Sequence, residues 1–259
     1  MGILNLTPDS FYDGGQHFGI ETAIKHVEKM LIDGASIIDI GGYSTRPGAD
    51  EISVDEELKR IIPVIKNISK EFPEAFLSVD TFRSKVAFES IHAGAHIVND
   101  ISSGDDDTEM MSIVAKLGTP YIMMHKKGSS KNMQHNPQYE NVVLEVLNYF
   151  TAKIAEAKNA GIVDLIIDPG FGFGKNTQHN YQLLNALDDF QIFGLPLLVG
   201  VSRKKMIQAI TGNDSANALN GTTAANTIAL FKGANILRVH DVKQAVECIN
   251  IMNATHGII

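Results

Sequence analysis

The sequence has little of what marks secreted, membrane-bound or nucleic-acid-binding proteins. Its one cysteine, Cys248, excludes an internal disulfide and favours a reducing compartment. There is no basic leader followed by an apolar stretch, and no apolar run approaches membrane-spanning length. The net charge of −8 argues against a nucleic-acid surface. We therefore expect a cytoplasmic protein that binds neither membrane nor nucleic acid, and in which any anion site needs a local cluster of cations.

Linkers are missing as well. No proline-rich, serine-rich or low-complexity segment divides the 259 residues, of which 44% are apolar and 20% charged. Barrel folds often reach this length without dividing. We therefore expect one domain over residues 1–259.

Short apolar runs that end at a polar residue recur along the chain, and most follow an amphipathic stretch that closes at a glycine. Glycine is the usual C-terminal cap of a helix. About eight such strand–helix units fit a single-domain α/β protein, a (β/α)8 TIM barrel. A doubly wound open sheet is the alternative, although it rarely needs so many units. The polar residues at the ends of the runs are Asn5, Asp39, Asp80, Asn99, His125, Asp168, Ser202 and His240.

In a barrel these polar residues converge on one mouth, which is the strongest functional signal in the chain. The run Leu165–Ile167 carries the clearest example, because Asp168 stands at its tip before Pro169 and three alternating glycines. A carboxylate there is poorly solvated and needs a donor, which the N–H groups of a bound heterocycle would supply. The alternative is a capping aspartate on a glycine-rich connection. The glycine spacing matches neither a phosphate-binding loop nor a dinucleotide-binding fingerprint.

Four blocks that follow predicted strands carry a family resemblance. They are residues 5–15 (NLTPDSFYDGG), 41–48 (GGYSTRPG), 78–81 (SVDT) and 202–204 (SRK). In this order they resemble dihydropteroate synthases of folate biosynthesis, over nearly the whole chain. The resemblance implies condensation of 6-hydroxymethyl-7,8-dihydropterin diphosphate with 4-aminobenzoate to 7,8-dihydropteroate and diphosphate. It also implies Mg²⁺, inhibition by sulfonamides and a homodimer.

The resemblance assigns roles residue by residue. The residues expected to hydrogen-bond the pterin edge are Asp80, Asn99 and Asp168. The apolar walls around its ring are expected from Ile101, Met124 and Phe173. The residues expected to contact pterin or aminobenzoate beyond strand seven are Ser202 and Lys204. The diphosphate pocket is expected from Arg238 and His240, and the magnesium-linked residue is Asn5. The first mobile loop contributes Phe11 and Asp13, and the second contributes Thr45 and Arg46. Of these, the catalytic assignments are Lys204, Asp168, Arg46 and Asp13.

The chemistry of these side chains agrees with the resemblance. A pterin edge presents adjacent donors and acceptors, which two buried carboxylates and an amide can pair. No general base is poised for an attacking amine, so we expect diphosphate to leave first and to generate a pterin cation. We expect aminobenzoate to bind after diphosphate has been held at the mouth.

Three other functions share parts of this pattern. The folate-binding domain of corrinoid methyltransferases would keep Asp80 and Asp168 but would not need residues 44–47 or 202–204. A non-catalytic pterin-binding paralogue and a Schiff-base aldolase using Lys204 are the others. One departure from the family concerns the barrel floor, which its members cover with residues ahead of strand one, whereas this sequence begins almost at that strand.

Overall fold

The computed structural model describes residues 1–6, 16–43, 51–128 and 137–258, with backbone alone at 16–18. The strands are β1 (Gly2–Asn5), β2 (Ile37–Gly41), β3 (Phe76–Asp80), β4 (Ile97–Asp100), β5 (Tyr121–Met124), β6 (Leu165–Asp168), β7 (Leu198–Val199) and β8 (Ile236–Leu237). The helices are α2 (Gln16–Ile32), α3 (Val54–Glu71), α4 (Ser84–His92), α5 (Met110–Leu117), α6 (Val142–Asn159), α7 (Thr177–Asn185), α8 (Lys205–Thr211), α9 (Leu219–Phe231) and α10 (Val242–Thr255), with a 3₁₀ helix, η1 (Leu187–Phe193).

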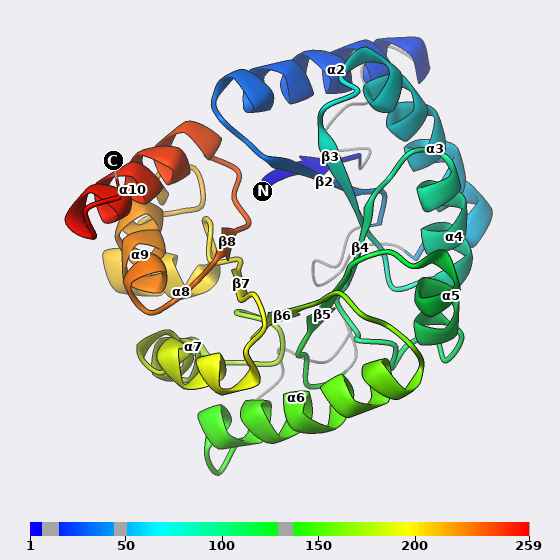
Figure 1. Ribbon diagram of the computed structural model, residues 1–259. Coiled ribbons are helices and arrows are strands. Elements are labelled where there is room, and N and C mark those ends of the chain that lie inside the picture. Colours follow the sequence, from blue (N-terminus) through cyan, green and yellow to red (C-terminus); the bar gives the residue numbers. More distant parts are fainter. Residues whose placement is uncertain (7–15, 44–50, 129–136, 259) are drawn as a thin grey trace.

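The strands form a closed parallel barrel with the helices outside it (Figure 1). Strands β1 to β6 pair in sequence order, and β7 pairs with β8. Two isolated bridges complete the ring, one between Ile167 and Leu197 and the other between Gly2 and Val239. The predicted (β/α)8 barrel is therefore confirmed, and the open-sheet alternative is wrong because β8 meets β1.

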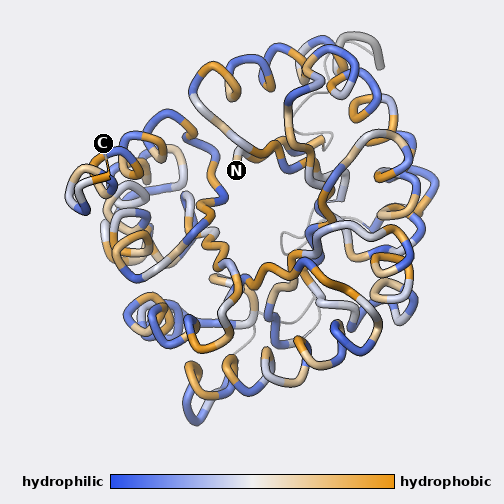
Figure 2. The backbone as a smooth tube through the Cα atoms, in the orientation of Figure 1, coloured by the Kyte–Doolittle hydropathy of each residue, from blue (hydrophilic) through white to orange (hydrophobic). Residues whose placement is uncertain are grey.

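Local sequence explains why the helices form where they do. Helix α3 begins after Ser53, whose side chain accepts a hydrogen bond from the N–H of Glu56 at 3.1 Å. Its predicted apolar stripe faces the strands, with Ile61, Ile65 and Ile68 fully buried. Helix α5 ends at Gly118, which takes the left-handed conformation, as predicted for the capping glycines. Figure 2 shows the resulting pattern, in which apolar residues dominate the ring of strands and the helices alternate between apolar and polar.

An apolar layer fills the barrel interior below the carboxyl ends of the strands. It contains the inward side chains Ile37, Ile97, Ile122, Ile166, Leu198 and Ile236. Successive strand residues point to opposite faces, so the residue two positions later on each strand lies above this layer. These later residues are Asp39, Asn99, Met124, Asp168, Gly200 and Arg238. The barrel thus places a polar layer on top of an apolar one.

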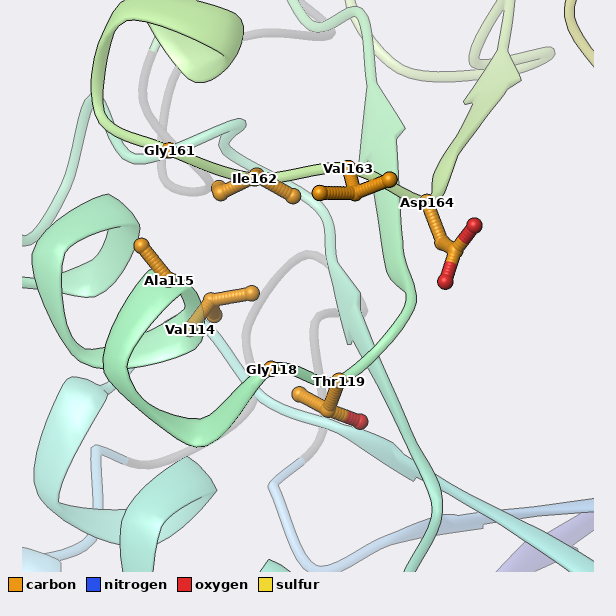
Figure 3. Close-up of a pocket in the computed structure, with 8 residues that line it drawn as sticks. All are labelled: Val114, Ala115, Gly118, Thr119, Gly161, Ile162, Val163 and Asp164. Atoms are coloured by element: carbon orange, nitrogen blue, oxygen red, sulfur yellow. The ribbon is translucent and has the colours of Figure 1, made fainter.

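Two hollows lie elsewhere on the molecule. A cavity of about 50 Å³ is lined by the ends of α5 and α6 and the segments that lead into β5 and β6 (Figure 3). A groove of about 620 Å³ lies between α6 and α7. The small cavity is at the amino ends of the strands, away from the face where barrel enzymes carry their chemistry. Among the described helices, none has the length and apolar character needed to cross a bilayer.

Candidate active site

Arg238 joins two carboxylates at the carboxyl end of the barrel. Its Nε donates to Oδ2 of Asp39 at 2.6 Å, and its Nη2 donates to Oδ2 of Asp80 at 2.6 Å. Asn99 donates from Nδ2 to the same Oδ2 of Asp39 at 3.1 Å. The neighbours of Arg238 in the chain, Leu237 and Val239, are buried on the opposite face. The strand ends therefore meet as one charged network.

Burial shapes the charge of this network. The pKa of Asp80 is raised to about 7 because burial disfavours its carboxylate, although the Arg238 guanidinium opposes that shift. The pKa of Arg238 is raised because Asp39 and Asp80 outweigh the desolvation of its guanidinium. The other oxygen of Asp39, Oδ1, is buried and has no hydrogen-bond partner among the described residues.

Asp168 stands at the tip of β6, as predicted, and only 6% of its surface is exposed. Its Oδ1 accepts a hydrogen bond from the N–H of Gly170 at 2.8 Å. Burial raises the pKa of the Asp168 carboxyl, while Lys204, that hydrogen bond, Arg238 and Lys175 act to lower it. The carboxylate is therefore oriented by the turn that follows it and is surrounded by cations.

That turn, residues 169–175, requires glycine. Gly170, Gly172 and Gly174 have φ angles of 72°, 81° and 67°. A Cβ on Gly170 would lie 1.9 Å from the carbonyl oxygen of His125, and a Cβ on Gly174 would lie 2.3 Å from that of Lys127. The glycines therefore allow this turn to pack closely against the connection that follows β5.

Lys204 lies over the same turn. Its Nζ donates to the carbonyl oxygen of Phe171 and sits 4.7 Å from the ring centroid of Phe173. Burial lowers the pKa of Lys204 to about 8, against the opposing effect of Asp168. Gly200 lies between Lys204 and Arg238. A Cβ added to it would be 3.8 Å from Cβ of Arg238 and 3.9 Å from Nζ of Lys204, so these two side chains are neighbours. The structure thus brings Lys204, Asp168 and the Arg238 network together.

The remaining predicted residues frame this centre. Ile101 and Met124 are buried, and Phe173 is partly exposed beside Lys204. Ser202 and His240 lie three residues past the ends of β7 and β8, and Oγ of Ser202 is 3.1 Å from Nδ1 of His240. Asn5 is the last residue of β1. A Cβ added to Gly41, which pairs with Asp80, would lie 3.7 Å from Oδ1 of Asn5, so Asn5 lies close to the Asp80 end of β3. The predicted positions Phe11, Asp13, Thr45 and Arg46 fall outside the described residues.

The two flanks of segment 44–50 are held by Arg83. Its guanidinium lies 5.2 Å from the ring centroid of Tyr43, and its Nη2 donates to the carbonyl oxygen of Ile52 at 2.7 Å. The fully buried Glu57 accepts from Nη1 of Arg83 at 2.8 Å. Sequence reasoning missed this pair because its two residues stand far apart in the chain, on two different helical units.

Sequence reasoning also placed Asp39 two residues too late in its strand. Asp39 was expected at the end of a strand, whereas β2 continues through Ile40 and Gly41, which pair with Val79 and Asp80. Asp39 is therefore fully buried inside the barrel. Lys175 was missed as a site residue, because the sequence was tested there only for a phosphate-binding loop, which it does not match. A lysine that closes an otherwise apolar, glycine-rich turn was the available signal.

Comparisons with known proteins agree with this geometry. The family model described as pterin binding enzyme matches residues 1–240. A dihydropteroate synthase of Escherichia coli is 49% identical over 98% of this chain and 90% of its own length. The structure of the Yersinia pestis dihydropteroate synthase with a sulfonamide drug complex has a TM-score of 0.93 and 47% identity, covering 99% of this chain and 93% of that one. The Xanthomonas albilineans enzyme with 4-aminobenzoic acid has a TM-score of 0.92 and 41% identity, covering 100% of this chain and 93% of that one.

Proposed function

The chain belongs to the family of pterin binding enzymes, and on that premise we propose that it catalyses the dihydropteroate synthase reaction. The enzyme is a transferase that joins 6-hydroxymethyl-7,8-dihydropterin diphosphate to 4-aminobenzoate, with release of diphosphate. The observation that carries the proposal is the convergence of two carboxyls, Asp80 and Asp168, and the amide of Asn99 at the mouth of one barrel. This donor and acceptor set matches the edge of a pterin ring.

The pterin edge would lie across the polar layer. Asp168 presents Oδ2, because Oδ1 is held by Gly170, and Asp80 presents Oδ1, because Oδ2 is held by Arg238. Ile101, Met124 and Phe173 supply apolar contacts for the faces of the ring. Buried acceptors of this kind reject ligands that lack matching donors, since an unpaired buried polar group is costly.

The chemical step needs no general base before bond formation. The bond between the pterin methylene and the diphosphate oxygen breaks with its electron pair, which leaves on diphosphate. The methylene becomes cationic, and the negative charges of Asp80 and Asp168 favour that charge. The nitrogen lone pair of aminobenzoate forms the new C–N bond, and the nitrogen then releases one proton to solvent or diphosphate. Lys204 and Ser202 would contact the aminobenzoate ring, and the prediction that Thr45–Pro47 also contact it concerns positions outside the described residues.

Magnesium fits the site as an ion shared with the substrate. In the described part of the chain, no cluster of three or more His, Cys, Asp or Glu side chains could hold a metal alone. Asn5 offers an amide oxygen at the end of β1, and Mg²⁺ commonly binds one or two protein oxygens together with substrate phosphates. When bound, the ion would neutralise charge that develops on diphosphate. Arg238 and His240 are the protein groups assigned to the same leaving group.

Two further properties belong to this proposal. Cellular location in the cytoplasm is supported by the single, buried Cys248. A homodimer is supported by the family resemblance and by exposed apolar residues on α9, where Ile228 and Phe231 are 47% and 54% exposed. Sedimentation at micromolar concentration checks the dimer, and a monomer mass would contradict it.

The test of function is direct. Purified protein is incubated with the pterin diphosphate, 4-aminobenzoate and Mg²⁺, and diphosphate and dihydropteroate are both quantified. We expect equal amounts of the two products. Diphosphate release without dihydropteroate would indicate hydrolysis alone, and pterin binding with no release would indicate a binding protein; either result would overturn the proposal.

A further inference from the structure

Lys175 is a buried amine that the proposed chemistry does not use. It is only 3% exposed, and it is the last residue of the turn 169–175 that follows Asp168. Its Nζ lies 2.9 Å from the carbonyl oxygen of Gly170 and 3.1 Å from that of Phe173. It also lies 2.8 Å from Nδ1 of His125 and 3.3 Å from the carbonyl oxygen of the same residue. No hydrogen bond joins it to a carboxylate among the described residues.

An ammonium is well suited to this position. It has three hydrogens, which Gly170, Phe173 and Nδ1 of His125 can accept, and the carbonyl of His125 is a longer fourth contact. The negative ends of three peptide dipoles converge here and would repel each other without a cation between them. Burial lowers the pKa of Lys175 well below its usual value, with Lys204 in the same direction, while Asp168 opposes the shift and the acceptors around Nζ favour the ammonium. Burial and the neighbouring Lys175 lower the pKa of His125 to about 2, so its ring is neutral, and Nδ1 accepts when Nζ donates to it.

Stability alone does not account for the charge. A methionine would fill much the same volume without the cost of removing an ammonium from water, and apolar replacement of buried charges is often neutral or stabilising. The contacts of Lys175 instead determine the direction of the carbonyls in a turn that is left-handed at every second residue. What the turn presents to the site depends on those directions.

The turn 169–175 carries three contacts of the pterin site on its other side. The N–H of Gly170 holds Asp168 at 2.8 Å, and the carbonyl of Phe171 accepts from Lys204. The ring of Phe173 lies against the same ammonium at 4.7 Å. We infer that Lys175 is a positioning residue of the pterin site, which holds this turn from below so that Asp168, Phe173 and Lys204 keep their places around the pterin. The inference rests on the proposed function.

The charge of Lys175 adds an electrostatic effect to the geometric one. Lys175 is among the cations that lower the pKa of Asp168 against burial. Removing it should raise that pKa. Asp168 also faces Lys204 and Arg238, and Asp80, whose pKa is about 7, titrates in the same site. Pterin affinity needs the ionised Asp168 carboxylate, and the part of the affinity that Asp168 supplies is lost as pH falls through its pKa. We call this loss of affinity toward low pH the acid limb. It should begin at a higher pH when the ammonium is gone. A residue that only stabilised the fold would leave the acid limb unchanged.

The test compares Lys175→Met with wild type and with Lys153→Met. Lys153 is a matched control, since its side chain is 12% exposed and it pairs with Asp105 in the segment after β4 and with Glu156 on α6. Binding of 6-hydroxymethylpterin is titrated from acid to neutral pH below the unfolding temperature of each variant. For Lys175→Met we expect Kd to rise about tenfold or more, the acid limb to move to higher pH, and amide exchange over residues 165–177 to accelerate. Lys153→Met should match wild type in all three.

The outcomes separate this inference from the proposed function. A folded Lys175→Met with wild-type affinity, acid limb and exchange, in a chain whose wild type turns over, would overturn the inference alone. If wild type makes no product and binds no pterin, the proposed function fails. In that case amide exchange still tests the role of Lys175, because exchange over residues 165–177 that is unchanged in Lys175→Met would reject its role in holding the turn. If Lys175→Met does not fold, Lys175→Arg replaces it. That variant keeps the charge, so we expect weaker pterin affinity with an unshifted acid limb, and wild-type affinity would overturn the inference.

Discussion

Replacing Asp168 by asparagine isolates one atom of the pterin site. Because the N–H of Gly170 donates to Oδ1 at 2.8 Å, the asparagine oxygen will stay at that position. Its NH₂ group will then stand where Oδ2 faces the site. An acceptor for the pterin N–H groups becomes a donor, so one buried hydrogen bond turns into a contact between two donors.

The size of the loss follows from the burial of this carboxyl, which is 6% exposed. Breaking a buried, charge-assisted hydrogen bond costs about 2–4 kcal/mol. That energy corresponds to roughly a 30- to 1,000-fold rise in the Kd for 6-hydroxymethylpterin. Stability should change little, because the bond to Gly170 survives and the steric volume is the same.

Isothermal titration with the pterin measures the effect, and thermal unfolding checks the fold. Asp164→Asn is the matched control, since Asp164 is exposed just before the same strand at the opposite end of the barrel. We expect the control to bind like wild type. Pterin affinity of Asp168→Asn within about twofold of wild type, or about 0.4 kcal/mol, would refute the placement of the pterin edge on Asp168.

The other predictions concern the cations and the second substrate. Burial lowers the pKa of Lys204 to about 8, so its positive charge is present below that pH and lost above it. The kcat/KM for aminobenzoate should therefore fall above about pH 8 and stay level in Lys204→Arg; a wild-type profile that is flat through this range contradicts the assignment. Arg238→Met leaves the carboxylates of Asp39 and Asp80 without their cation and should lower the free energy of unfolding by about 3–5 kcal/mol, measured by urea titration. Arg203→Met leaves one carboxylate, Asp241, which is not fully buried as Asp39 is, and should cost less. Sulfonamides should inhibit competitively with aminobenzoate, and steady-state inhibition of another pattern would count against a shared site. Aminobenzoate should bind measurably with pterin, magnesium and diphosphate present and poorly alone, and equal affinity by titration in both conditions would reject ordered binding.

The fold was predictable because its signals are local and repeated. Most helices carry an apolar stripe and end at or just before a glycine, and each buried strand is a short apolar run, so the count of units indicates the barrel. The position of Asp168 followed from the same logic, since a strand that stops at a polar residue places it at the mouth. The role of the three glycines was visible too, because their φ angles depend on the turn itself.

The contacts across the barrel were not predictable from the sequence. Arg238 meets Asp39 and Asp80 from positions about 200 and 160 residues away, and only the stagger of the closed strands brings them to the same level. A shift of β2 by one residue would have turned Asp39 out of the barrel, since side chains alternate between faces. Lys175 was missed for a related reason. Besides Nδ1 of His125, its partners are backbone carbonyls, and a carbonyl leaves no trace in the sequence.

The position of Arg238 reconciles its contact with Asp80 and its assignment to the leaving group. The guanidinium is held by two carboxylates through different nitrogens, Nε to Asp39 and Nη2 to Asp80. Asp39 is fully buried and pairs in register with Ser78, two residues before Asp80 on β3, so it lies deeper in the barrel than Asp80. If the pterin edge draws Asp80 away, Arg238 keeps its bond to Asp39 and stays at the mouth, with Nη2 turned toward an incoming anion. Asp80 and Arg238 can therefore each take up their part of the substrate in one step, while Asp39 prevents the cation from leaving with the diphosphate.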